Sequence, residues 1–118
     1  MRPLRSLHEN RACATLDTAV ARTSYYDGPW SLYLVTDSGA CDRTYDFQVQ
    51  ITNAIVSHPN LLKFKGRVLS SGLVRVCVTA GAKYASGSGR LSQASGSGRW
   101  SGRSGGDRCF GHWTAQRF

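Results

Sequence analysis

Hydrophobic and polar residues alternate with a period of two along most of the chain. In the clearest example, Phe47, Val49 and Ile51 are separated by the polar residues Gln48 and Gln50. Such alternation predicts a β-strand with one buried side and one solvent-facing side. The same pattern recurs, less cleanly in places, within 25–35, 62–68, 74–79 and 109–118.

Turn-forming sequences separate these segments and suggest the architecture. Thr36–Gly39 and Ser70–Gly72 are rich in Ser and Gly, which favour tight turns. We count about seven or eight short strands at regular spacing, which is typical of a sandwich or a barrel. Short connections favour pairing between successive strands, and closure removes exposed sheet edges. The sequence therefore predicts an all-β fold, a small antiparallel up-and-down barrel.

The last third of the chain contains an internal repeat. Ala85–Ser92 reads ASGSGRLS and recurs as Ala94–Ser101, which reads ASGSGRWS, with Trp100 in the place of Leu91. Sequences rich in Ser and Gly can form flexible linkers. We favour two successive strands instead, because large apolar residues interrupt the segment at strand spacing. Glycines inside these strands then mark a close approach of a neighbouring element.

Residues 1–24 lack the alternation, so we separate them from a barrel domain over 25–118. They mix charged with small residues, which predicts a flexible or loosely docked extension, with a short helix over Ala12–Ala21 as the alternative. Met1–Arg5 begins like the basic start of an export signal, but Ser6–Arg11 are polar where such a signal is apolar. No stretch approaches the roughly 20 apolar residues of a membrane span.

The chain is strongly basic. It has 15 Lys and Arg residues against seven acidic ones, a formal net charge of +8. Such an excess suits an anionic partner, such as nucleic acid, an acidic polysaccharide or membrane head groups. It also suits a solvated barrel exterior, and the lack of consecutive basic residues favours this second interpretation.

Four cysteines occur, at positions 13, 41, 77 and 109, without the spacing of a zinc site. If the last strand closes the barrel against the first, antiparallel pairing brings Cys109 close to Cys41. A Cys41–Cys109 disulfide would then fasten the closure and imply an oxidising compartment. Two reduced thiols are the alternative. Cys13 and Cys77 are either free or paired with each other.

A search for catalytic chemistry finds no specific signal. Most acidic residues fall in predicted turns, where aspartate caps backbone amides. Asp42 and Asp46 lie four apart near a strand start, which does not make the facing pair of a hydrolase. No nucleophile elbow, phosphate loop or dinucleotide fingerprint occurs in its required context. We therefore expect a non-enzymatic protein with no catalytic residues, no metal and no cofactor.

Aromatic and basic residues are better candidates for a binding site. Trp30, Trp100 and Trp113 fall on predicted inward faces, where they form core or line a cavity beside the glycine-rich strands. Aromatic and basic side chains together can stack on bases or sugars, although a solvated surface looks the same in sequence. The candidates on the outer face are Tyr33, Arg67, Arg75, Arg90 and Arg99, and Arg103 is expected on the same polar face.

Both ends of the predicted barrel resemble a known group of sequences. Tyr26–Ser31, YDGPWS, and Gly39–Asp42, GACD, resemble the opening of small exported domains of alphaproteobacteria without an assigned function. The endings are similar as well, in Gly98–Gly102, GRWSG, and Arg108–Ala115, RCFGHWTA. The resemblance extends over about residues 25–117, and its motifs are specific only as a set.

This resemblance implies a β-barrel in the cell envelope or outside the cell, with Cys41 and Cys109 as the shared cysteines. The chain departs from it in lacking a leader and in carrying Cys13 and Cys77. More distantly, the Gly-x-Trp of Gly28–Trp30 resembles the start of lipocalins, avidins and bacterial metalloprotease inhibitors. That similarity implies an architecture and no binding residues.

Three functions remain compatible with the sequence. The leading hypothesis is a periplasmic or secreted binding module, acting through a barrel mouth or its basic outer face on an anionic glycan or another envelope component. The second is a barrel that binds another protein as a protease inhibitor does, with 1–24 inserting into that partner. The third is a cytoplasmic nucleic-acid-binding barrel, which requires reduced cysteines.

Overall fold

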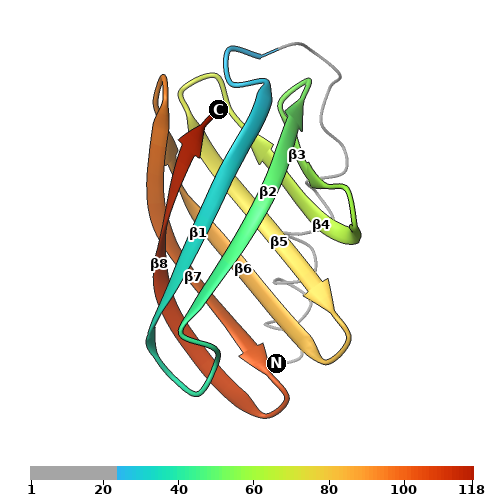
Figure 1. The fold of residues 1–118 in the computed structure, drawn as a ribbon, viewed down its shortest axis with the longest axis vertical. Helices are drawn as coiled ribbons and strands as arrows, with labels where there is room; N and C mark the ends of the chain where they lie inside the picture. Colours follow the sequence, from blue (N-terminus) through green and yellow to red (C-terminus); the bar gives the residue numbers. More distant parts are fainter. Residues whose placement is uncertain (1–23) are drawn as a thin grey trace, which may run out of the picture.

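The computed structural model describes residues 24–118, which form a closed barrel of eight antiparallel strands (Figure 1). The strands are β1 (Gly28–Ser38), β2 (Thr44–Thr52), β3 (Ile55–His58), β4 (Leu61–Val68), β5 (Leu73–Ala80), β6 (Lys83–Leu91), β7 (Ser95–Ser104) and β8 (Asp107–Arg117). Each strand pairs with the next, and β8 pairs with β1 to close the cylinder. The predicted all-β up-and-down barrel is confirmed.

The interpretation of the N-terminal part remains a prediction. Apart from Ser24, the extension over 1–24 lies outside the described residues, and so do the alternative helix over Ala12–Ala21 and Cys13. From Ser24 onward every element is a strand, a turn or a short connection.

The two copies of the internal repeat lie on β6 and β7, which are paired along their whole length. Gly87 stands opposite Trp100, and Leu91 stands opposite Gly96. The prediction of two successive strands is therefore confirmed, and the linker alternative is wrong. Because apolar and glycine positions share the inward face, the repeat places indole rings beside strands that have no side chain there.

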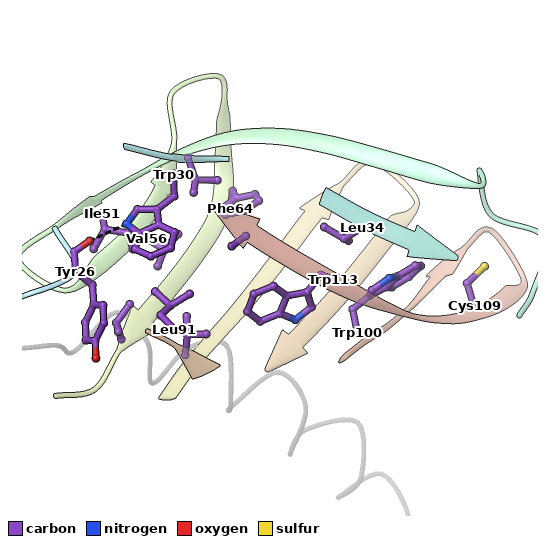
Figure 2. Close-up of a cluster of buried hydrophobic side chains, with 14 residues drawn as sticks. Tyr26, Trp30, Leu34, Ile51, Val56, Phe64, Leu91, Trp100, Cys109 and Trp113 are labelled. Atoms are coloured by element: carbon purple, nitrogen blue, oxygen red, sulfur yellow. Dashed lines mark hydrogen bonds between the residues drawn. The ribbon is translucent and has the colours of Figure 1, made fainter. Parts of the chain in front are cut away.

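Side chains on the inward faces form one continuous core (Figure 2). Two tryptophans show how the glycines contribute: a Cβ on Gly98 would lie 2.7 Å from Cε2 of Trp113, and a Cβ on Gly111 would lie 2.6 Å from Nε1 of Trp100. Only glycine fits under rings this close. The buried side chains include Trp30, Leu34, Val49, Ile51, Val56, Phe64, Val68, Val74, Leu91, Trp100, Trp113 and Ala115.

The C-terminal end of β8 lies beside the start of β1 at one end of the barrel (Figure 1). The side chain of Arg117, the last residue of β8, closes this end. Its guanidinium donates hydrogen bonds of 2.8 Å to the carbonyl oxygens of Tyr25 and Asp27. The same group lies 5.3 Å from the ring of Trp30, within the range of a cation–π interaction. Trp30 Nε1 donates to the carbonyl of Tyr26, and both rings are buried. This end of the cylinder is therefore filled.

The Asp27 carboxylate holds the turn between β2 and β3. It accepts hydrogen bonds from the backbone N–H groups of Asn53 at 2.8 Å and Ala54 at 3.0 Å. Both turn residues have positive φ, 53° and 69°, which non-glycine residues adopt at a cost. Burial raises the pKa of Asp27, but hydrogen bonds from Ala54, Ser24 and Asn53 together outweigh it, so the pKa lies below its ordinary 3.8.

A disulfide joins Cys41, in the β1–β2 connection, to Cys109, near the start of β8. The two Cα atoms are 6.0 Å apart, and Cys109 is fully buried. The predicted pairing is confirmed, and the alternative of two reduced thiols is wrong. Cys77 is also disulfide-bonded, which excludes a free thiol at that position. Disulfides of this kind are typical of oxidising, extracellular-type environments.

The barrel wall is incomplete beside β3. This strand has four residues and pairs with β2 only over Gln50–Thr52, so Thr44–Val49 have no strand neighbour on that side among the described residues. Aromatic side chains bridge the gap on the inside. The Phe47 and Phe64 rings lie 5.5 Å apart between centroids, and His58 lies within 5.9 Å of both.

Candidate functional site

The end of the barrel away from Arg117 holds a pocket of about 200 Å³. It lies beside the β1–β2, β5–β6 and β7–β8 connections. Figure 1 shows these connections at the lower end of the barrel. Most of its lining is apolar or aromatic; Leu34 and Trp100 at its base are buried, and the other apolar residues are partly buried, as the walls of an open pocket are. They include Leu34, Cys41, Tyr45, Phe47, Val78, Ala85 and Trp100.

Two cations stand at the rim of this pocket. Lys83 begins β6 and Arg103 lies near the end of β7, and both side chains are exposed. Lys83 is paired with Ser104, and Tyr84 with Arg103, so the two cations come from directly neighbouring strands. None of the residues of 24–118 that line the pocket is acidic. The opening is therefore apolar inside and positively charged at its edge.

The pocket walls are held in place from two sides. The Tyr45 ring meets the Trp100 ring edge-on at 6.2 Å, and the Tyr45 hydroxyl accepts a hydrogen bond from the Asp42 backbone N–H. Trp100 Nε1 donates to the carbonyl of Val35 at 3.1 Å. The disulfide at Cys41 fixes the loop that carries these contacts. The aromatic walls are thus oriented before any ligand arrives.

A second, smaller cavity of about 60 Å³ lies deeper in the core. Trp30 and Trp113 line it together with aliphatic side chains, and Trp100 borders both this cavity and the open pocket. Figure 2 shows the three indoles in sequence along the barrel, with Trp30 at the closed end, Trp113 in the middle and Trp100 toward Cys109. Of the predicted tryptophan candidates, only Trp100 reaches the open pocket.

The strand cations are confined to one part of the barrel wall. Strands β1, β2 and β3 contain no Lys or Arg, whereas β4 to β8 all carry them. On β4 to β8 the single acidic residue is Asp107, at the very start of β8. Among the strands of residues 24–118, positive charge is therefore confined to one side of the barrel wall.

Within this wall, a row of outward-facing side chains crosses five strands and contains three arginines. On successive pairs of neighbouring strands, Arg67 stands opposite Arg75, Arg75 opposite Ser88, Ser88 opposite Arg99, and Arg99 opposite His112. We call these five residues the arginine row. Their neighbours along each strand point into the core, so the row faces outward, and all but the partly buried Arg67 are exposed.

The other two outer-face candidates, Arg90 and Tyr33, lie in a second row next to the arginine row. On β6 this second row is two residues further along the strand, at Arg90 instead of Ser88. Arg90 is paired with Ser97, Ser97 with Thr114, and Thr114 with Tyr33. Tyr33 is 42% exposed and is the aromatic member of this second row. The structure thus brings the predicted arginines together on one surface and separates them from the tryptophans.

The rim residue Lys83 was not among the candidates predicted from the sequence, and Arg103 was predicted on the outer face with the other arginines rather than at a pocket rim. An exposed contact of 2.8 Å between the Asp37 carboxylate and Nδ1 of His112, the last member of the arginine row, was not predicted either. The alternation along β6 could have predicted the position of Lys83, because Lys83 lies at an alternate position from Ala85 and Gly87, whose side of the strand faces inward. It does not predict that Arg103 lies at the rim. The contact between His112 and Asp37 depends on the pairing of β8 with β1.

Comparisons with protein families, curated proteins and solved structures find no match to this chain. Within residues 24–118, no helix has the length and apolar character needed to cross a membrane.

Proposed function

We propose that this protein is a non-enzymatic binding module, and that the open end of its barrel binds a small amphipathic anion. The observation that carries the proposal is the union of apolar walls around Trp100 with the rim cations Lys83 and Arg103. The ligand class is a short acyl chain or an aromatic ring that carries a carboxylate, sulfate or phosphate. Such molecules are components and breakdown products of cell envelopes.

The size of the pocket supports a ligand of this class. A dry apolar cavity of about 150 Å³ accommodates benzene, so about 200 Å³ suits one ring or a short chain. Each buried methylene contributes roughly 0.8 kcal/mol, which gives most of the affinity to the apolar part. An exposed cation adds about 0.2–1 kcal/mol, so Lys83 and Arg103 select the sign of the head group.

The Cys41–Cys109 bridge supports a location in the periplasm or outside the cell. A disulfide between a loop and the closing strand persists in an oxidising compartment and is rare in the cytosol. A cytoplasmic role, as in the nucleic-acid-binding alternative, agrees poorly with this bridge.

The test uses three probes with the same chain and different head groups: octanoate, octanol and octylammonium. Binding is followed through the indole N–H signal of Trp100 in ¹⁵N NMR spectra. We expect octanoate to bind most tightly and octylammonium most weakly. The double variant K83Q/R103Q should lose about 3- to 10-fold in octanoate affinity and leave octanol binding unchanged.

Two further variants complete the design. Ala85→Phe fills the pocket and should weaken binding of all three probes, whereas Lys63→Gln removes an exposed cation from β4 and should change none of them. The proposal fails if no probe shifts the Trp100 signal, or if octylammonium binds as tightly as octanoate.

A further inference from the structure

We propose that the arginine row is a second binding site, on the outside of the barrel, for an acidic polysaccharide. It shares no residue with the open pocket and does not depend on the ligand bound there. The inference rests on the register of β4 to β8, on the exposure of the side chains and on the one-sided distribution of charge.

The geometry of the row suits a linear polyanion. Neighbouring strands lie about 4.8 Å apart, so Arg75 and Arg99, on either side of Ser88, are separated by about 10 Å at the backbone. Guanidinium groups bind carboxylates and sulfates in a planar, two-pronged way. A polymer lying across the strands would meet Arg67, Arg75 and Arg99 in succession. The contact between His112 and the Asp37 carboxylate marks the end of this cationic stretch.

Two arginines of the row repel each other in the folded protein. Arg67 and Arg75 are direct cross-strand neighbours, and like charges in this position repel. Among the described residues, no acidic side chain forms a salt bridge with either arginine. Removing one of the two charges would relieve this repulsion, and an anion bound between them would relieve it as well.

Hydroxyl groups between the cations favour a sugar polymer over a nucleic acid. Ser88 lies between Arg75 and Arg99, and Ser97 and Thr114 lie beside the row on β7 and β8. These groups donate and accept hydrogen bonds, as sugar hydroxyls do. Single-stranded nucleic acids are held by series of aromatic side chains, whereas the two rows contain as aromatic residues only Tyr33 and His112, at positions that are not directly opposite each other.

The experiment measures binding of polygalacturonate, with neutral dextran and an oligothymidylate of matched charge as comparison ligands. We expect polygalacturonate to bind, with an affinity that falls as salt is raised, because cations and anions are screened. Dextran should not bind. The double variant R75Q/R99Q should lose about tenfold or more in affinity, while R43Q/K63Q, which removes two exposed cations outside the row, should stay within about twofold of the parent.

Folding and the first site are checked in the same samples. Thermal unfolding shows whether R75Q/R99Q retains the barrel, and octanoate titration shows whether the open pocket is intact in that variant. Equal losses of affinity in R75Q/R99Q and R43Q/K63Q would overturn the proposal, because the total charge of the protein, rather than the position of the arginines in the row, would then explain binding. Tighter binding of the oligothymidylate than of polygalacturonate would overturn it in favour of a nucleic-acid site.

Discussion

Arg67 lies directly opposite Arg75 on the neighbouring strands β4 and β5, so two guanidinium groups project from the same stretch of outer wall. Like charges in this arrangement destabilise a sheet by roughly 0.2–1 kcal/mol. We therefore expect Arg67→Gln to raise the free energy of unfolding by this amount at low salt, and to weaken polygalacturonate binding at the same time.

Urea unfolding at two salt concentrations measures this effect. Because salt screens the repulsion, the gain in stability should shrink as salt is added. Arg90→Gln is the matched control, since Arg90 stands opposite Leu73 and Ser97 and faces no cation across the strands. A loss of stability in R67Q, or a gain that salt does not change, would contradict the electrostatic explanation.

Gly98 provides a test of core packing. In Gly98→Ala the new Cβ would lie 2.7 Å from Cε2 of Trp113 and 2.7 Å from the Cα of Gly89. Overpacking of this kind costs about 1–3 kcal/mol, and we expect that loss in urea unfolding together with a changed near-ultraviolet tryptophan signal. Gly106→Ala, whose Cβ would meet nothing within 4 Å, should be close to neutral.

The lowered pKa of Asp27 predicts a specific sensitivity to acid. Its carboxylate stabilises the fold at any pH above the unfolded-state value, near 3.8, and that contribution is lost as pH falls through the lower folded-state pKa. The parent should therefore lose stability progressively below about pH 4. Asp27→Asn should be less stable at neutral pH and should show a flatter dependence over this acidic range.

The control for Asp27 is Asp46→Asn, which removes a carboxylate from the exposed face of β2. Thermal melts over a pH series compare the two variants. If D46N and D27N show the same pH dependence, the hydrogen bonds to Asn53 and Ala54 are not the source of the effect.

Removal of the Cys41–Cys109 bridge should cost considerable stability. The bridge spans 68 residues of sequence, and for a loop of this length the chain-entropy contribution is about 4 kcal/mol. We expect the C41S/C109S variant to unfold at lower urea by a corresponding amount and to bind octanoate less tightly, because the loop that supports Tyr45 is released. A stability change below about 1 kcal/mol would show that the barrel closes without this constraint.

The sequence allowed the inward faces, the closure and the bridge to be predicted, and for a common reason. A period of two identifies the buried side of a strand from local information alone, as for Phe47, Val49 and Ile51. Once strands pair in order, the antiparallel rule brings the ends of β1 and β8 together, which places Cys41 near Cys109. These inferences need the order of the strands but not the exact register between neighbouring strands.

The structural features that the sequence did not predict depend on the register between strands or on very short strands. The four residues Ile55–His58 of β3 are too few to show alternation. Lys83 and Arg103 meet at the pocket rim only because of the register between β6 and β7. For the same reason, the sequence placed the arginines on one face but could not show that Arg67, Arg75 and Arg99 fall into line.

The short β3 also bears on how this molecule meets other chains. Between Thr44 and Val49, β2 has no partner strand on the β3 side in the described structure. A longer β3 would form hydrogen bonds with the backbone of β2 there. An extended segment of another chain can add there by main-chain hydrogen bonds alone. Asp46 stands in the middle of this stretch, and a charged residue on an edge discourages two copies from pairing edge to edge. Asp46 is the one charged side chain among Thr44–Val49, so at this part of the wall it is the residue that opposes edge-to-edge pairing.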